Sequence, residues 1–116
     1  MAISVQFIKG LDEEISSVSL RQRRGSSSKI VVLVFEHLQA IQKLRAYRNQ
    51  ISNLWLKDEE GEIQVTPNGI KFLYIDDDTL SKVECSFEVN SESAFERVMR
   101  FLHRYAEVNG FQFQSR

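Results

Sequence analysis

Apolar and polar residues alternate along several short segments of the chain. Residues 3–8 and 82–90 place apolar side chains at every second position, and residues 18–23 alternate Val18, Leu20 and Gln22 with Ser19, Arg21 and Arg23. A period of two is that of a β-strand with one face toward a core. The inward set in residues 82–90 consists of Val83, Cys85, Phe87 and Val89. The pattern therefore predicts three half-buried strands, of which 18–23 turns a basic face outward.

Three further segments are typical of strands. Residues 30–35 are apolar on both faces and rich in β-branched residues, which favours a central place in a sheet. Residues 51–56 predict another strand, and a hairpin turn follows at 58–61, where Gly61 suits a positive φ. Residues 62–75 are long for one strand and are interrupted by Pro67, so we expect an edge or a bulge there.

The apolar spacing changes to that of a helix in residues 91–109. Apolar side chains recur there at intervals of three and four, which predicts an amphipathic helix. Ser93 with Glu96 fits a capping box, Ser91 is an alternative N-cap, and Gly110 suits a left-handed C-cap. Residues 37–47 have apolar residues at three-residue spacing and predict a second, shorter helix.

One side of the long helix mixes apolar and basic residues. On a helical wheel, Phe101 and Val108 fall beside Arg97 and Arg104, outside the main apolar stripe. One interpretation is a partner-binding strip in which Phe101 is partly exposed between the two arginines. The alternative is a broad apolar face that wraps a curved sheet.

Together these elements predict an α+β domain. We expect a mainly antiparallel sheet of about five to six strands, one long C-terminal helix packed on it, and a shorter helix between central strands. The length of 116 residues suits a single domain spanning residues 1–116. No apolar run reaches the roughly 18 residues typical of a membrane span, and the N-terminus lacks the pattern of a secretory signal.

Charge is unevenly distributed although the net charge is only −1. Residues 17–50 carry seven basic residues against Glu36, whereas residues 51–96 carry eleven acidic residues against three lysines. Such segregation indicates electrostatic orientation toward a partner, with Arg21, Arg23 and Arg24 as candidate contacts. The alternative is that the two segments interleave in the fold and their fields cancel.

No constellation of residues indicates catalysis. Cys85 is the only cysteine and lies on the inward face of a predicted strand, so we expect a buried structural thiol. His37 and His103 have no motif partner. The acidic runs 76–78 and 58–60 lack the ligand spacing of a calcium loop, which indicates solvated turns. We therefore expect no enzyme, no metal and no cofactor, and the modest pI of about 6.1 argues against nucleic acid.

Several runs resemble the photosystem II reaction-centre assembly protein family, the Psb proteins numbered twenty-eight. Residues 97–111, Arg-Val-Met-Arg-Phe-Leu-His-Arg-Tyr-Ala-Glu-Val-Asn-Gly-Phe, resemble the C-terminal run of that family. Residues 56–62, Leu-Lys-Asp-Glu-Glu-Gly-Glu, are similar to its hairpin, and Gln6-Phe7 and Gly10 match its opening. The similarity extends over nearly the whole chain.

The chain departs from the family pattern at three places. Phe95 stands where the family usually has Trp, and residues 53–55 read Asn-Leu-Trp in place of Gly-Met-Tyr. Residues 73–76 read Leu-Tyr-Ile-Asp in place of Val-Asn-Gly. These departures indicate a divergent paralogue.

The resemblance implies a non-catalytic assembly or repair factor that binds photosystem II intermediates transiently. Its implied partners are the inner-antenna chlorophyll protein and reaction-centre subunits, with no cofactor of its own. The implied location is the cytoplasmic side of the thylakoid membrane, peripherally bound, and the cytoplasm when unbound. No transit peptide is visible, so we expect a cyanobacterial or plastid gene. A general protein- or RNA-interaction module unrelated to photosynthesis is the alternative.

Overall fold

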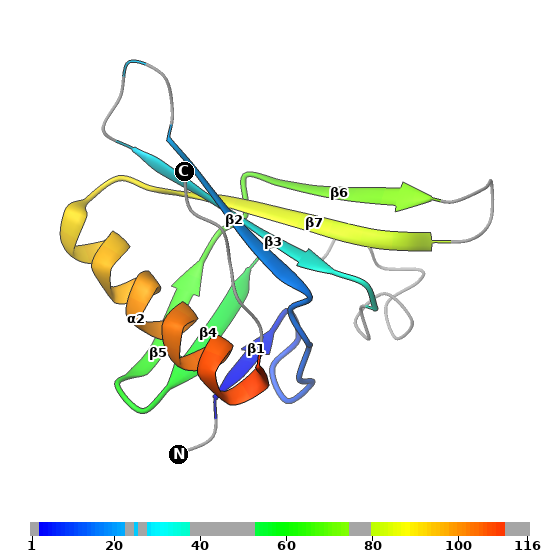
Figure 1. Cartoon of the computed structure of the whole chain (residues 1–116), viewed down its shortest axis with the longest axis horizontal. Helices are drawn as coiled ribbons and strands as arrows, with labels where there is room; N and C mark the ends of the chain where they lie inside the picture. The colour runs from blue at the N-terminus through cyan, green and yellow to red at the C-terminus, as the bar shows by residue number, and fades with distance from the viewer. Residues whose placement is uncertain (1–2, 23–24, 26–27, 38–52, 75–79, 111–116) are drawn as a thin grey trace.

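A computed structural model describes residues 3–22, 25, 28–37, 53–74 and 80–110 of the chain. Within these residues lie seven strands and one helix (Figure 1). The strands are β1 (Ser4–Gln6), β2 (Ser17–Gln22), β3 (Lys29–Phe35), β4 (Leu54–Asp58), β5 (Gly61–Val65), β6 (Gly69–Tyr74) and β7 (Leu80–Val89), and the helix is α2 (Glu92–Asn109). A short helix was expected at residues 37–47. Residues 38–47 lie outside the described part of the chain.

The strands form two antiparallel sheets. One has the order β1-β4-β5 and the other has the order β2-β3-β7-β6. The chain alternates between them, because β2 and β3 follow β1, β4 and β5 return to the first sheet, and β6 and β7 return to the second. The predicted α+β class and antiparallel pairing are confirmed, but the prediction of one sheet with five to six strands is wrong.

Pro67 lies where the chain passes from one sheet to the other. The predicted long strand is divided into β5 before it and β6 after it, and these two strands belong to different sheets. Proline has no N–H to donate to a ladder, which ends pairing at this point. The next residue resumes pairing, since the Asn68 N–H donates to the Ser86 carbonyl at 2.7 Å. The expected edge is also present, because β6 is an outer strand of its sheet.

The central strand and the alternating strands lie as the hydrophobic pattern predicts. β3 pairs with β2 on one side and with β7 on the other, and its Val31, Leu33 and Phe35 are fully buried. The four residues of β7 that were predicted to point inward are buried as well: Val83, Cys85, Phe87 and Val89. Phe7 packs edge-on against Phe35 with ring centroids 5.4 Å apart, so the segment after β1 contributes to the same core.

The C-terminal helix begins and ends at residues suited to its termini. The Ser91 side chain accepts a hydrogen bond from the Ala94 N–H at 3.1 Å, so Ser91 and not Ser93 is the N-cap. Gly110 has a φ of 71° and donates its N–H to the Ala106 carbonyl at 2.7 Å. The predicted left-handed C-cap is confirmed.

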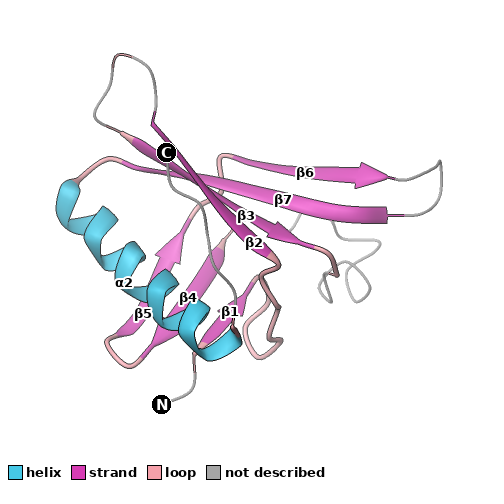
Figure 2. Cartoon of the chain, in the orientation of Figure 1, coloured by secondary structure: helices cyan, strands magenta, loops and turns pink. Residues whose placement is uncertain are grey.

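Helix α2 packs against both sheets. It contacts β4 of the three-stranded sheet and β7 of the four-stranded sheet, and it lies across the small sheet in Figure 2. Because two sheets cover the helix, its buried face is wider than one apolar stripe. Phe101 is fully buried beside Leu102, so the predicted partial exposure of Phe101 is wrong, and the alternative of a broad apolar face holds for Phe101. Val108 is 71% exposed.

A buried hydrogen bond ties the N-terminal loop to this helix. The Ile15 N–H donates to the Tyr105 hydroxyl at 2.9 Å. Both residues are at most 3% exposed and belong to the core cluster. A buried backbone N–H without a partner would be costly, so Tyr105 satisfies a group that the loop could not satisfy with a ladder.

Candidate functional site: the hairpin–helix cluster

The hairpin between β4 and β5 presents three acidic side chains in succession. Asp58 and Gly61 are paired residues at the end of the ladder, and Glu59 and Glu60 form the turn. Gly61 has a φ of 125°, a backbone conformation that favours glycine. The Glu60 N–H donates to the Asp58 carboxylate at 2.9 Å, which fixes the acidic side chain against its own turn.

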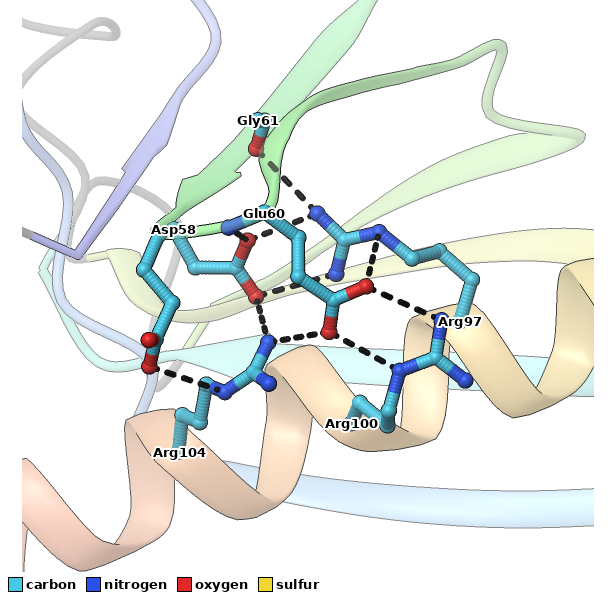
Figure 3. Close-up of polar contacts among 7 residues, drawn as sticks. Asp58, Glu60, Gly61, Arg97, Arg100 and Arg104 are labelled. Atoms are coloured by element: carbon cyan, nitrogen blue, oxygen red, sulfur yellow. Dashed lines mark hydrogen bonds and ion pairs between the residues drawn. The ribbon is translucent and has the colours of Figure 1, made fainter.

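Three arginines of α2 point toward this turn. Arg97, Arg100 and Arg104 are spaced by three and four residues, which places them on one side of the helix. Figure 3 shows their guanidinium groups converging on Asp58 and Glu60. We refer to Asp58, Glu59, Glu60, Arg97, Arg100 and Arg104 as the hairpin–helix cluster.

Asp58 is the buried centre of the cluster. Its side chain is only 1% exposed, and Arg97 binds both carboxylate oxygens, at 2.9 and 2.6 Å. Arg104 donates to the same carboxylate at 2.9 Å. Arg97 also donates to the Gly61 carbonyl at 3.2 Å. Bidentate guanidinium–carboxylate pairs are strong and directional, so this contact fixes the hairpin relative to the helix.

Glu60 and Glu59 complete the cluster nearer the surface. Arg100 binds both oxygens of Glu60, at 2.8 and 3.0 Å, and Arg104 donates to Glu60 at 2.5 Å. The Arg104 Nε lies 3.3 Å from a Glu59 oxygen. Three carboxylates thus face three guanidinium groups (Figure 3), and their formal charges cancel within the cluster.

The ion pairs shift the acid–base properties of the two inner carboxylates. Burial raises the pKa of Asp58, but hydrogen bonds from Arg97 and Arg104 outweigh burial and lower the pKa to about 2. Hydrogen bonds from Arg100 and Arg104 lower the pKa of Glu60 to about 2 as well. Hydrogen bonds to Glu60 in turn raise the pKa values of Arg100 and Arg104. All of these groups are therefore charged at neutral pH.

A groove lies beside the cluster at the C-terminal end of α2. Its volume is about 410 Å³, and it is lined by Ile3, Asp58, Glu59, Arg104, Glu107 and Val108. The cluster forms one wall, the last turn of α2 forms another, and the residue before β1 forms a third. The cluster therefore positions a surface feature as well as holding two elements together.

The residues predicted as partner contacts are separated in the fold. Arg97 and Arg104 are brought together, but they bind Asp58. Phe101 is buried and offers no contact surface. Arg21 is exposed on β2, an outer strand of the four-stranded sheet, while Arg23 and Arg24 lie outside the described residues. The predicted continuous strip of Arg97, Phe101 and Arg104 is therefore not an open surface.

The prediction of a solvated acidic turn at residues 58–60 is wrong for Asp58, which is 3% exposed. The sequence-based prediction of site residues did not include Arg100 or the acidic partners Asp58 and Glu60. Two signals were available in the sequence: three arginines at helical spacing and an acidic hairpin of matching charge. Their pairing could not be inferred from spacing, because Asp58 and Arg97 are 39 residues apart.

The candidate nucleophile Cys85 is part of the core cluster. Cys85 is fully buried, and burial raises the pKa of its thiol to about 12. In the described part of the chain, no three His, Cys, Asp or Glu side chains are grouped so as to hold a metal ion. His103 is exposed on α2.

The fold and the cluster define a class: a small two-sheet α+β protein whose terminal helix is ion-paired to a hairpin. Among the helices that the structure describes, none is long and apolar enough to cross a bilayer. The model of the Psb28 protein family matches residues 5–113, which is most of the chain. The chain belongs to the Psb28 family.

Relatives match over almost their full length. The Photosystem II reaction center Psb28 protein of Acaryochloris marina is 33% identical over 116 residues, covering 99% of each chain. The protein of the same name from Thalassiosira pseudonana is 32% identical, with 97% of each chain covered. That from Cyanidioschyzon merolae is 34% identical, with 96% of each chain covered. The expected family is confirmed in relatives from cyanobacteria and algae.

Proposed function

We propose that this chain is a non-catalytic assembly or repair factor that binds photosystem II intermediates transiently. It acts as one domain, bound peripherally at the cytoplasmic face of the thylakoid membrane, and it is cytoplasmic when unbound. Its proposed partners are the inner-antenna chlorophyll protein and reaction-centre subunits. The observation that carries the proposal is the full-length match to proteins named for photosystem II.

The arrangement of the strands supports a binding role. In the described part of the chain, the two antiparallel sheets have four outer strands, β1 and β5 in one and β2 and β6 in the other. An outer strand has unpaired backbone groups that can accept a strand from a partner. A factor that must later leave benefits from such a modest and partly polar contact.

Charge supports the same role on the four-stranded sheet. Residues 17–35 contain Arg21, Arg23, Arg24 and Lys29 and no acidic residue. We propose that Arg21, Arg23 and Arg24 contact the partner first and orient the encounter. Arg97 and Arg104 contribute indirectly, because they hold the β4–β5 hairpin in place.

A pulldown from solubilised thylakoids tests the proposal. The affinity-tagged full chain is incubated with detergent-solubilised membranes, and bound proteins are identified by mass spectrometry. We expect recovery of inner-antenna and reaction-centre subunits of photosystem II above the level captured by an unrelated tagged protein. Recovery of RNA or ribosomal proteins in their place would contradict the proposal and favour a general interaction module.

A further inference from the structure

The groove beside the hairpin–helix cluster combines an exposed apolar side chain with excess negative charge. Val108 is 71% exposed, and Ile3 lines the groove from the segment before β1. Asp58, Glu59 and Glu107 contribute three carboxylates to the lining, whereas Arg104 is its single cation. Arg97 neutralises Asp58 and Arg104 faces Glu59, so Glu107 leaves the groove with one uncompensated negative charge.

The single cation is already engaged. Arg104 donates to Asp58 and Glu60, and its Nε lies 3.3 Å from Glu59. Glu59 nevertheless has a side chain that is 62% exposed. Within the described residues, Glu107 forms no ion pair. The groove can therefore accept a further cation at Glu59 and Glu107 without breaking the pairs of Asp58.

The helix terminus adds to the negative potential. The last turn of α2 contains Glu107 and no basic residue. A helix C-terminus has the negative end of the macrodipole and is usually stabilised by a nearby cation. The Gly110 N–H and the Asn109 side chain satisfy the Ala106 and Tyr105 carbonyls, and neither is charged. A cation from elsewhere would complete this end of the helix.

We propose that this groove binds a segment of a photosystem II subunit in which a lysine or arginine adjoins an aliphatic side chain. The cation lies between Glu59 and Glu107, and the aliphatic side chain covers Val108 and Ile3. This inference rests on the proposed function and deepens it by assigning a second contact surface, distinct from the basic strand β2. One partner would then be held by charges of opposite sign at two places.

Photo-crosslinking tests the occupant directly. Val108 is replaced by p-benzoylphenylalanine in the tagged full chain, which is then irradiated with solubilised thylakoid membranes. A matched control has the same label at Glu96, an exposed residue in the first half of α2. We expect the label at Val108, and not the one at Glu96, to join a photosystem II peptide with a lysine or arginine beside an aliphatic residue.

A charge-reversal pair gives an independent measurement. Glu107→Lys should lower the recovery of photosystem II subunits by about tenfold at low salt, because like charges at an interface cost binding free energy. Glu96→Lys changes the net charge equally on the same helix and should leave recovery within about twofold. Thermal melts confirm that both variants are folded.

The outcomes separate this inference from the proposed function. If photosystem II is recovered but Val108 crosslinks only to this chain, to a second copy, or to an acidic segment, the inference fails and the proposed function stands. Equal recovery with Glu107→Lys and with Glu96→Lys would also overturn the inference. If the unlabelled chain recovers no photosystem II subunit, both the proposed function and the inference fail.

Discussion

At the scale of single residues, Asp58 contributes most to the stability of the hairpin–helix cluster, because its carboxylate is the buried one among the three in the cluster. Asp58→Asn should lower the free energy of unfolding by about 2–3 kcal/mol, since the two arginines lose a buried anion. Chemical denaturation at pH 7 measures this loss. As a control, Glu62→Gln removes only the exposed pair with Lys9 and should change stability by less than about 1 kcal/mol. Equal effects would contradict the central place of Asp58.

The low pKa of Asp58 makes the fold sensitive to acid. Its pKa is about 2 in the folded chain against an ordinary 3.8, so its ionised form contributes stability above pH 4 that is lost as pH falls toward 2. The contribution is about 2 kcal/mol. The stability of Asp58→Asn should therefore fall less steeply between pH 4 and 2 than that of the parent. Identical slopes would show that Asp58 does not carry this dependence.

Cys85 should be inert toward thiol reagents in the native state. Burial raises the pKa of its thiol to about 12, so the reactive thiolate is scarce at pH 8 and is shielded from the reagent. We expect Ellman's reagent to react with one thiol per chain in urea and at least about a hundredfold more slowly without urea. Fast labelling of the native chain would contradict a structural role.

At the scale of elements, the sequence allowed either Ser91 or Ser93 to be the N-cap of α2, and the structure assigns this place to Ser91. Ser91→Ala removes the bond to the Ala94 N–H and should cost about 1 kcal/mol of stability. Ser93 lies in the first turn of α2 and is exposed, so Ser93→Ala should change stability by less than about 0.5 kcal/mol. Urea melts of both variants give the comparison, and a larger loss for Ser93→Ala would reverse the assignment.

The width of the buried face of α2 gives a second prediction at this scale. Phe101→Ala should destabilise the fold by about 3–5 kcal/mol and Leu102→Ala by about 2–5 kcal/mol, because both side chains are fully buried. Val108→Ala should change stability by less than about 0.5 kcal/mol. Thermal melts test the series. If Phe101→Ala were as stable as Val108→Ala, the result would contradict the burial of Phe101 and would support the interpretation of an exposed strip.

Local pattern was a reliable guide to these elements. Val83, Cys85, Phe87 and Val89 alternate because one face of β7 meets the core, and Gly110 ends α2 because it accepts a left-handed conformation. The division into two sheets was not predictable from Pro67 alone, since a proline interrupts pairing without indicating where the chain goes next. Phe101 was misassigned because a helical wheel assumes one covering surface, whereas α2 has two.

At the scale of the whole molecule, opposite charges are placed on different surfaces. Arg21 lies on an outer strand of the four-stranded sheet, and the acidic groove lies at the other sheet, beside β1 and the β4–β5 hairpin. The candidate site was predictable only in part, because Arg97 and Arg104 were identified while their acidic partners were assigned to solvent. Ion pairs between distant segments depend on the tertiary fold, and the hydrophobic periodicity of each segment does not predict them.

The separation of charge predicts that association with membranes weakens as salt rises. Interactions between exposed charges are largely screened beyond about 8 Å at physiological ionic strength and beyond about 3 Å at 1 M. Retention of the tagged chain on isolated thylakoid membranes should therefore fall between low and molar salt. Arg21→Gln should flatten this dependence relative to the parent, whereas Lys71→Gln on β6 serves as a matched control. Unchanged retention at all salt concentrations would contradict an electrostatic encounter.

The bond between the Ile15 N–H and the Tyr105 hydroxyl has a consequence for biosynthesis. It joins residues 90 positions apart, and β3 likewise needs β7 as its neighbour. A nascent chain emerging from the ribosome therefore lacks β7, the partner of β3, and Tyr105, the partner of the N-terminal loop, until α2 has been translated and has left the exit tunnel. Contacts of such long sequence separation form slowly and late. The chain should thus fold after synthesis rather than during it, and a ribosome stalled before residue 90 should hold a polypeptide that proteases cleave readily.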